Sequence, residues 1–416
     1  MREQRGGAGT VVSINLGNFG STGGIVRGVA QVARASGFRC YAAFPPTKHN
    51  RTPYEESDIL IGRYWPQYLW ANLDQFIGMN GCYSFFATLR FLRRLDQLEP
   101  DIVHLHNVHY SFIHLPLLFR YLKKHGIAVV WTLHDCWAFT GHCAYFTMSD
   151  CEKWRTRCFD CPCLNEYPAT KADHSRALYG LKRKWFCGVP RMMLVTPSRW
   201  LAGLAAQSFL REYPVMAIHN GIDPAVFRPT ESDFRAAHGL TDRFMLLGVA
   251  FFWDKRKGLD AFATLAERLG ARYQIVLVGT TEETKAAVPA SILCIDRTAD
   301  RQELAALYTA ADLFVNPTRE ENYPTVNMEA LSCGTPVITF DTGGSAEIAD
   351  ETCGMTVPWN DVDALERGIR DICENGRFSK EACLLRARAF DERAAYTQYI
   401  ELYERMMRGP ETERNV

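Results

Sequence analysis

Two glutamates, Glu321 and Glu329, lie on either side of a predicted helix start in the second half of the chain. Pro324 fits the first turn of that helix, because the N–H that proline lacks has no helical partner there. Backbone amides at a helix N-terminus bind anions, so this segment places two acids beside an anion site. That combination suits a ligand with both hydroxyls and phosphates, since carboxylates accept hydrogen bonds from sugar hydroxyls. Taken alone, two glutamates on a surface helix would be the simpler interpretation.

A basic run precedes another predicted helix. Lys257 ends the sequence Lys-Arg-Lys, which Gly258 follows. The helix dipole disfavours basic side chains at a helix N-terminus, which weakens the alternative of a solvated surface run. Lys257 is therefore a candidate cation for an anionic ligand.

The first half of the chain places small and polar residues after its predicted strands. Gly23 and Gly24 lie between a strand and a helix, where glycine lets the backbone approach a phosphate or sugar closely. His134 ends an apolar strand and should project from its carboxyl end, although a lone histidine is more often a packed structural residue. Three further polar residues follow the neighbouring strand, with simple packing as the alternative: His106, Asn107 and His109.

Five of the 14 cysteines fall close together: Cys143, Cys151, Cys158, Cys161 and Cys163. In a reducing compartment, such a cluster indicates metal ligands before disulfides. Four thiolates can enclose a tetrahedral zinc ion as a structural site. We expect Cys143, Cys151, Cys158 and Cys161 to be the ligands, because Pro162 separates Cys163 awkwardly from its neighbour. Zinc would order the loop without taking part in catalysis, and the alternatives are a metal-free loop or oxidised pairs.

The elements that position these residues alternate between strand and helix, which predicts parallel sheets with helices on both faces. Strands are expected at residues 10–16, 40–44, 102–106, 127–133, 192–196 and 215–218, and then at 244–249, 273–278, 292–295, 313–316 and 337–340. Turn-forming residues from His219 to Thr230 predict a linker. The fold class is therefore α/β, with two doubly wound, Rossmann-like domains facing a central cleft. Their predicted extents are 1–218, with a cysteine-rich insert at 135–163, and 219–389, with a terminal helix at 390–408 packing back on the first domain.

Composition excludes several classes of protein. The chain has 416 residues, 47 basic and 47 acidic side chains and no net charge, so it lacks the basic surface of a general nucleic-acid binder. We expect no nucleic-acid partner. No apolar run approaches the length of about 18 residues needed to span a bilayer. The first apolar stretch is too short for a signal-peptide core, which predicts a cytoplasmic protein.

The ordered set of motifs resembles the retaining glycosyltransferases of family 4, which have the GT-B fold. Two glutamates separated by seven residues precede Ala-Leu-Ser-Cys-Gly-Thr-Pro. The other landmarks appear in order: Gly23-Gly24, Thr132-Leu133-His134-Asp135, Pro197-Ser198-Arg199-Trp200, Asn220-Gly221-Ile222-Asp223, Arg256-Lys257-Gly258, Ala311-Asp312-Leu313 and Gly343-Gly344-Ser345-Ala346-Glu347. Within the family, the sequence His-Asn-Val-His at 106–109, His-Asp-Cys-Trp at 134–137 and the cysteine insert look like exopolysaccharide transferases of the colanic-acid type.

The resemblance implies a role for each candidate residue. Lys257 and helix amides would hold the donor diphosphate, Glu321 the sugar hydroxyls, Glu329 the ribose, and His134 the transferred sugar. Further donor-binding positions are Gly23, Gly24, Arg256, Asn322, Tyr323, Pro324, Thr325 and, near the nucleobase, Arg297. His106, Asn107 and His109 would line the acceptor side, and no catalytic metal is expected. The chain departs from the family at Phe251, because an arginine usually stands six residues before the lysine.

The sequence thus predicts a retaining enzyme that moves a hexose from a nucleotide-diphosphate sugar to a saccharide or lipid-linked saccharide acceptor, in surface polysaccharide or glycan biosynthesis. The alternatives are a sugar-nucleotide epimerase of the same fold and a catalytically inactive scaffold, which Phe251 motivates. A basic, aromatic segment predicts peripheral contact with an anionic membrane at its inner face, with a solvated helix face as the alternative. That segment contains Phe85, Phe86, Leu89, Arg90, Phe91, Leu92, Arg93 and Arg94, and Lys123-Lys124 end a nearby helix.

Overall fold

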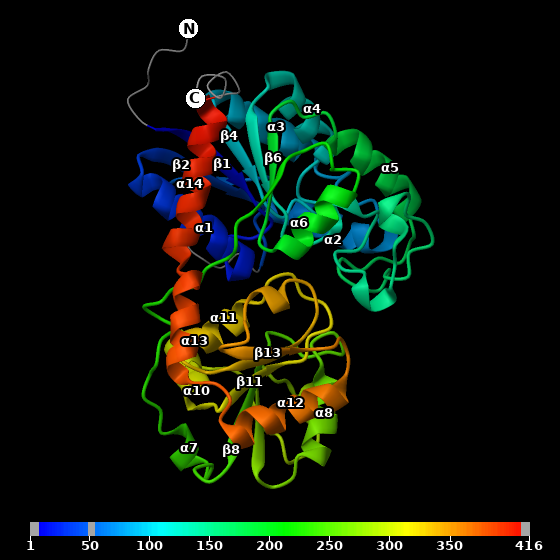
Figure 1. Ribbon diagram of the computed structural model, residues 1–416. Helices are drawn as coiled ribbons and strands as arrows, with labels where there is room; N and C mark the ends of the chain where they lie inside the picture. Colours follow the sequence, from blue (N-terminus) through cyan, green and yellow to red (C-terminus); the bar gives the residue numbers. More distant parts are fainter. Residues whose placement is uncertain (1–7, 49–54, 409–416) are drawn as a thin grey trace. The chain divides into compact units, whose positions relative to one another are not determined.

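The computed structural model describes residues 8–48 and 55–408 (Figure 1). The chain divides into two compact units. The first contains the residues up to Ile218 together with those from Ala395 onward, and the second runs from His219 to Ala394. The division at His219 coincides with the start of the predicted linker.

The first unit is built on a seven-stranded sheet. In spatial order its strands are β3 (Asp58–Leu60), β2 (Phe38–Phe44), β1 (Gly9–Ile14), β4 (Ile102–Leu105), β5 (Ala128–Thr132), β6 (Met192–Thr196) and β7 (Val215–Ala217). All neighbours pair in parallel. Successive residues of a strand enter different apolar cores: Val129 and Trp131 belong to one cluster, and Ala128 and Val130 to the other. A sheet buried on both faces explains why its strands are almost wholly apolar.

Helices cover both faces of this sheet. They are α1 (Gly20–Ala35), α2 (Tyr64–Ile77), α3 (Phe85–Leu98), α4 (Leu115–His125), α5 (Ser175–Phe186) and α6 (Arg199–Gln207). The cysteine-rich insert between β5 and α5 contains only short 3₁₀ turns: η1 (Trp137–Phe139), η2 (Thr147–Ser149) and η3 (Lys153–Arg155). Its aromatic and cysteine side chains join the larger apolar core of the unit.

The last helix, α14 (Glu392–Arg408), completes the first unit (Figure 1, red). The Tyr403 hydroxyl lies 2.6 Å from His104 Nδ1, and the Tyr399 hydroxyl lies 3.2 Å from Thr132 Oγ1. Gly28 on α1 leaves room for this helix, because a Cβ there would meet the Tyr396 ring at 2.2 Å. The terminal helix therefore packs on the first unit through a buried polar network.

The second unit is built on a six-stranded parallel sheet. In spatial order its strands are β10 (Leu293–Ile295), β9 (Tyr273–Val278), β8 (Phe244–Val249), β11 (Leu313–Asn316), β12 (Val337–Phe340) and β13 (Gly354–Val357). Its helices are α7 (Phe234–Ala237), α8 (Leu259–Arg268), α9 (Glu282–Ala286), α10 (Arg301–Ala310), α11 (Thr325–Ser332), α12 (Val362–Asn375) and α13 (Lys380–Ala387), with a 3₁₀ turn η4 (Ser345–Glu347). The 3₁₀ turn η5 (Arg388–Phe390) precedes α14. Strand order reverses between β8 and β11, and ligands of such sheets bind beyond the carboxyl ends of the strands at that point.

The predicted fold class of two Rossmann-like α/β domains is confirmed. Two strands that the sequence did not predict, β3 and β13, are short edge strands. Helix α1 begins five residues earlier than expected, at Gly20 instead of Ile25. Across the described residues, we find no helix whose length and apolar character together would suffice to cross a bilayer.

Candidate active site

The acid segment of the second unit lies at the carboxyl edge of the sheet, between β11 and α11. Glu321 is in the loop and Glu329 is in the helix, as the sequence predicts. A glycine pair after β12 supports the loop. The Gly344 N–H donates a hydrogen bond of 2.7 Å to the Asn322 carbonyl, and a Cβ on Gly343 would lie only 1.6 Å from the Glu321 carbonyl oxygen. Glycine at 343, with φ of +54°, is thus required for the two loops to touch.

Lys257 forms an ion pair with Glu321. It lies in the loop before α8, because Gly258 takes the cap position with φ of +77°. The Lys257 backbone N–H donates to Asp254 Oδ1 at 2.8 Å, which fixes the turn. Burial acts to raise the pKa of Glu321, but the charge and hydrogen bond of Lys257 outweigh it, and the pKa is lowered. Glu321 is therefore ionised at neutral pH.

Glu329 has a different environment. The hydroxyl of Tyr308, a fully buried residue on α10, donates a hydrogen bond of 3.0 Å to Glu329 Oε2. Burial raises the pKa of Glu329, and hydrogen bonds from Tyr308 and Thr325 offset only part of that rise. The two acids thus differ in proton affinity, because the pKa of Glu321 is lowered and that of Glu329 is raised.

The neighbouring donor-binding candidates lie around the same edge. Tyr323 is buried and stacks on His219, with ring centroids 4.8 Å apart. Pro324 was expected in the first turn of α11. It is instead the cap residue, and the helix begins one position later, at Thr325. Arg297 is exposed in the loop that follows β10.

Two arginines near the acids, Arg256 and Arg319, make different contacts. The Arg256 guanidinium donates to the Glu320 carbonyl at 3.1 Å. Arg319 is buried and binds both Asp260 carboxylate oxygens, at 2.7 and 3.0 Å, and Asn360 Oδ1 at 2.7 Å. Arg319 thus anchors the acid loop to α8. No sequence signal marks this role, because its partner Asp260, half-exposed in the first turn of α8, lies 59 residues away along the chain.

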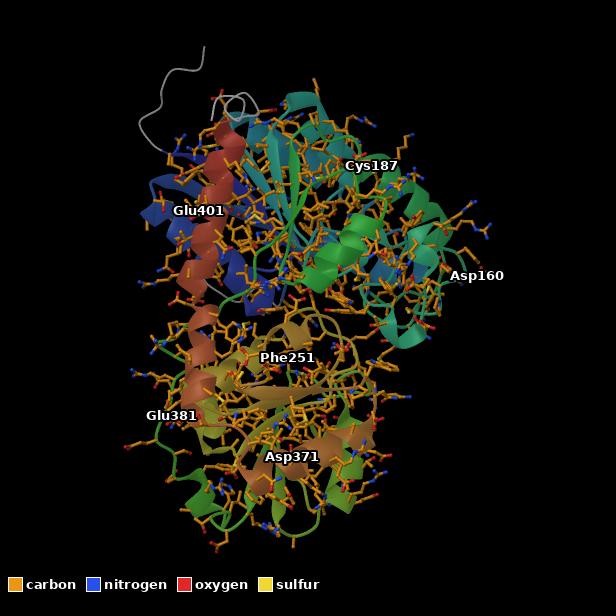
Figure 2. The ribbon with its side chains drawn as sticks, viewed as in Figure 1. Asp160, Cys187, Phe251, Asp371, Glu381 and Glu401 are labelled. Atoms are coloured by element: carbon orange, nitrogen blue, oxygen red, sulfur yellow. The ribbon has the colours of Figure 1, made fainter. Side chains whose placement is uncertain are left out.

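Phe251, which replaces the arginine usual in the family, is 94% exposed (Figure 2). It follows β8 directly, at the carboxyl edge that carries Lys257. A side chain of this size and exposure packs against little of the unit, so the position has room for a longer, charged residue.

Three histidines line the carboxyl ends of β4 and β5 in the first unit. His106 Nδ1 lies 3.0 Å from His134 Nε2, and His104 bonds Tyr403 and, at 2.8 Å, Thr132 Oγ1. Burial lowers the pKa of His134 to about 4 and that of His104 to about 3, and it lowers the pKa of His106 well below its usual range. All three rings are therefore neutral at pH 7, so His134 offers a neutral imidazole.

The predicted acceptor-side residues line one small pocket together with His134. His106 is buried, and its Nε2 has no hydrogen-bond partner among the described residues. His109 is buried too, with Nε2 3.4 Å from Asp135 Oδ2 and the Tyr167 hydroxyl 3.4 Å from its ring nitrogens. Asn107 also lines a larger, open cavity, and its backbone N–H donates to Asn15 Oδ1 at 3.1 Å.

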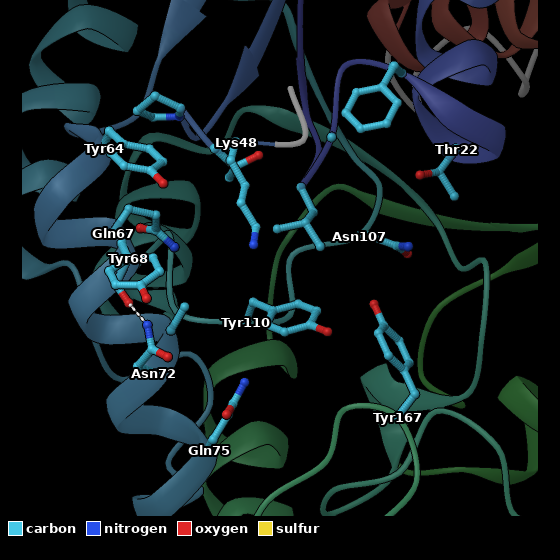
Figure 3. Close-up of a pocket in the computed structure, with 16 residues that line it drawn as sticks. Thr22, Lys48, Tyr64, Gln67, Tyr68, Asn72, Gln75, Asn107, Tyr110 and Tyr167 are labelled. Atoms are coloured by element: carbon cyan, nitrogen blue, oxygen red, sulfur yellow. Dashed lines mark hydrogen bonds between the residues drawn. The ribbon is translucent and has the colours of Figure 1, made fainter. Parts of the chain in front are cut away.

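That cavity has a volume of about 540 Å³ and lies within the first unit (Figure 3). Phenols, carboxamides and one amine dominate its lining, and these include Tyr64, Gln67, Tyr68, Asn72 and Gln75 from α2, Asn107 and Tyr110 from the loop after β4, Tyr167 from the insert, and Lys48. Figure 3 shows the Lys48 amine pointing into the space between the tyrosines. Aromatic faces pack against the apolar faces of sugars, and amides bind hydroxyls, so this lining suits an uncharged or anionic saccharide.

Gly23 and Gly24 are not in a loop. Both lie in the first two turns of α1, because the helix starts at Gly20. A Cβ on Gly23 would lie 2.7 Å from the Asn18 carbonyl carbon, whereas one on Gly24 would meet no described atom within 4 Å. Gly23 is thus required by the close approach of the preceding loop to the helix.

The insert gathers its thiols differently from the predicted set. Cys143, Cys161 and Cys163 lie within hydrogen-bonding reach of one another, and Ser149 Oγ is 3.1 Å from Cys163 Sγ. Cys158 Sγ instead accepts a hydrogen bond from the Gly141 N–H at 3.2 Å. Cys163, which the sequence analysis set aside, is therefore part of the cluster.

Thiols suit zinc chemically. Within residues 8–48 and 55–408, however, no three His, Cys, Asp or Glu side chains are arranged to hold a metal ion. The four predicted ligands, Cys143, Cys151, Cys158 and Cys161, nevertheless line one small pocket of the insert, and zinc binding stays a prediction.

A buried lysine that the sequence analysis missed supports the insert. Lys182 on α5 is fully buried, and its amine donates to the Trp137 and Thr140 carbonyls at 2.8 and 3.1 Å. Burial lowers the pKa of Lys182 to about 7. An apolar helix position occupied by lysine was the available sign, since Lys182 falls between Tyr179 and Trp185 on the buried face.

Comparisons with known proteins give two family matches. The family model described as Glycosyltransferase Family 4 matches residues 22–226, and the one described as Glycosyl transferases group 1 matches residues 243–375. Among curated proteins, the putative colanic acid biosynthesis glycosyl transferase WcaC of Escherichia coli is 28% identical over 270 residues, which cover 63% of this chain and 65% of that protein. The chain thus spans slightly less than two thirds of that relative's length.

Other relatives match shorter segments, and solved structures share the fold. A D-inositol 3-phosphate glycosyltransferase of Mycobacteroides abscessus is 31% identical over 34% of this chain and 35% of its own. Sucrose-phosphate synthase from Thermosynechococcus elongatus superposes with a TM-score of 0.69 at 18% identity, covering 96% of this chain and 99% of that chain. Anabaena HepE, solved in complex with UDP and glucose, gives a TM-score of 0.62 at 14% identity over 95% of this chain and 99% of its own. With both units matched in order, the chain belongs to the family 4, group 1 glycosyltransferases and has their GT-B fold.

Proposed function

We propose that this protein transfers a hexose from a nucleotide-diphosphate sugar to a saccharide or lipid-linked saccharide, with retention of anomeric configuration. The observation that carries the proposal is the arrangement at the carboxyl edge of β8 and β11. There, Lys257 pairs with Glu321, and Glu329 lies on the helix that the acid loop enters. One cation, one firmly ionised carboxylate and one carboxylate of raised pKa provide contacts for diphosphate, sugar hydroxyls and ribose.

The proposed chemistry needs no protein nucleophile. The acceptor hydroxyl attacks the anomeric carbon as the nucleotide diphosphate departs, on the same face of the sugar, and a donor phosphate oxygen takes the hydroxyl proton. Lys257 stabilises the charge that grows on the departing diphosphate. Glu321 orients the hexose through its hydroxyls. The imidazole of His134 is neutral, so its N–H donates a hydrogen bond to the transferred sugar and the ring carries no charge.

Two relatives support the class of substrate. Anabaena HepE was solved with UDP and glucose, which favours UDP as the first nucleotide to test. The name of the E. coli relative refers to colanic acid biosynthesis, which favours a surface polysaccharide as the pathway. The cavity of the first unit, with its tyrosines and carboxamides, is the proposed acceptor-binding site.

A donor-hydrolysis assay tests the proposal. Purified protein is incubated with UDP-hexoses, and nucleotide and sugar release are followed by NMR, which also reports the anomer first formed. Slow release of UDP and of an α-anomer from an α-linked donor is expected. Glu321→Gln should reduce that release, whereas Glu381→Gln on the exposed start of α13 is the matched control (Figure 2). Release of a rearranged sugar would instead indicate an epimerase.

Absence of any turnover would favour the inactive scaffold, and Phe251→Arg tests that alternative directly. The position is exposed, so arginine fits without repacking. If the missing cation limits the reaction, Phe251→Arg should tighten UDP binding and raise turnover. An inactive wild type whose Phe251→Arg variant gains neither would contradict the transferase proposal.

A further inference from the structure

Helix α2 of the first unit presents its large apolar side chains to the outside. Its outward residues, called here the α2 apolar face, are Trp65, Leu69, Trp70, Leu73, Phe76 and Ile77. Trp65 is 70% exposed, Leu69 64% and Phe76 55%. Their spacing repeats at three or four residues, so they lie along one side of the helix. Contiguous apolar patches of this kind mark interaction surfaces on soluble proteins.

The opposite side of α2 is polar and fixed to the unit. Gln67 and Asp74 are the only buried side chains of the helix. Ser84 Oγ donates to Gln67 Oε1 at 3.4 Å, and Asn80 Nδ2 donates to Asp74 Oδ2 at 2.8 Å. The amphipathic pattern is therefore inverted relative to a helix that packs on a core. Because these polar bonds set the rotation of the helix, the apolar face points outward by construction.

The α2 apolar face has no charged side chain of its own but has a lysine at its edge. Asp74 is the single charged residue of α2, and it is buried, so the exposed side carries no charge. Lys171 extends over the Phe76 ring, with its amine 4.5 Å from the ring centroid. The α2 apolar face thus combines an uncharged apolar surface with a cation on its rim.

Helix α3 adds further apolar and basic side chains. Its start packs on α2, since Ser84, which precedes α3, bonds Gln67. Phe86 at that start is exposed, and the solvent side of the helix continues with Arg90, Arg93 and Arg94. Apolar residues therefore give way to arginines along α3.

We propose that the α2 apolar face, with the arginines of α3, binds the surface of an anionic lipid bilayer. Tryptophan and other aromatic side chains favour the boundary between headgroups and acyl chains, and arginines bind anionic headgroups. At about 1.5 Å per residue, 14 helical residues extend only about 21 Å, too short for a hydrocarbon core of about 30 Å. The helix therefore lies in the interface and does not span it. This inference concerns a different surface from the donor site and does not depend on the proposed function.

A second copy of this chain fits the surface less well. A twofold interface through the α2 apolar face would bring the same patch from each copy together. The arginine stripes of the two α3 helices would then face each other without a matching acid on α2. An anionic bilayer supplies the complementary charge as well as the apolar interior.

Flotation of the full-length protein with lipid vesicles tests the proposal. One vesicle population contains phosphatidylcholine alone, and the other contains phosphatidylcholine with one fifth phosphatidylglycerol. Wild-type protein should float with the anionic vesicles, and the triple variant Trp65→Gln, Leu69→Gln, Phe76→Gln should bind at least about tenfold more weakly. Leu385→Gln is the matched control, because Leu385 is 65% exposed on α13 of the other unit. Its partition coefficient should equal that of the wild type.

The charges have their own readout. Arg93→Gln and Arg94→Gln should each lower binding to the anionic vesicles about fivefold, while binding to neutral vesicles stays unchanged. UDP binding by all variants should match the wild type, which separates this inference from the donor site. Equal flotation of the wild type and the triple variant would overturn the proposal. So would dimers in light scattering that the triple variant disperses, since the face would then be a protein interface.

Discussion

The substitution Glu329→Gln separates a functional carboxylate from a structural one. In the folded protein, burial raises the pKa of Glu329 above its ordinary value. The folded state then binds this proton more tightly than the unfolded state, so the group stabilises the fold at low pH. That contribution is lost as the pH rises through the folded-state pKa. At pH 7.5 an ionised Glu329 therefore costs stability, and glutamine removes the cost while keeping an oxygen for the Tyr308 hydroxyl 3.0 Å away.

Binding should respond in the opposite direction. If Glu329 accepts hydrogen bonds from ribose hydroxyls, the loss of charge costs about 1.5–3 kcal/mol, which is on the order of a 10- to 100-fold increase in the Kd for UDP. Calorimetric titration with UDP at pH 7.5 measures this, and thermal unfolding of the same samples checks the fold. We expect weaker binding with a Tm no lower than that of the wild type. Unchanged UDP affinity would refute the ribose assignment, and a Tm that falls with the affinity would show a structural role.

Tyr308→Phe changes the environment of the same carboxylate, because it removes the hydroxyl that donates a hydrogen bond to Glu329. Removing the donor raises the pKa of Glu329 further, because the Tyr308 hydrogen bond lowers it in the wild type. If UDP binding requires the ionised carboxylate, the affinity for UDP falls as the pH drops through the pKa of Glu329. In Tyr308→Phe, the pH at which UDP binding weakens should therefore be higher by about one unit. Tyr273→Phe, which removes a hydroxyl bonded to Glu374 at 2.7 Å elsewhere in the unit, should leave the profile in place.

Three further predictions concern separate parts of the molecule. Lys257→Met should raise the Kd for UDP, measured by calorimetry, by about tenfold or more. If this variant binds UDP with wild-type affinity, Lys257 does not contact the diphosphate. Tyr403→Phe leaves His104 Nδ1 buried without its 2.6 Å partner and should cost about 1–3 kcal/mol of unfolding free energy, measured by urea titration of the first unit's fluorescence. Metal analysis of reduced protein should find about one zinc per chain, which Cys158→Ser should abolish; metal-free wild type would leave the cluster as free thiols.

The acid segment was predictable because local rules and motif agree there. Pro324 and Gly334 bracket α11, and the helix begins at Thr325, directly after the proline that was expected in its first turn. The position of Lys257 before a helix was predictable, but its ion pair with Glu321, 64 residues further along the chain, depends on the three-dimensional fold.

Other features depend on contacts that periodicity does not encode. Helix α2 was not predicted, because apolar residues are expected on the buried side of a helix. In α2 the buried side chains are instead Gln67 and Asp74. The edge strand β13 was missed because it has only four residues, of which Met355 and Thr356 are not buried. The inclusion of Cys163 in the thiol cluster depends on the path of the chain around Pro162, which spacing alone does not define.

The packing of α14 has a consequence for biosynthesis. The core of the first unit includes Tyr396, Tyr399 and Tyr403, and the contact of Tyr403 with His104 joins positions 299 residues apart. During translation, β1 to β7 leave the ribosome before the second unit, but the helix that completes their core emerges only after it. The domain synthesised first is thus finished last. Until then, the part of its core that α14 covers is exposed to solvent or to chaperones. A truncated, released chain that ends at Ala394 should therefore be protease-sensitive in its first unit while its second unit is protected.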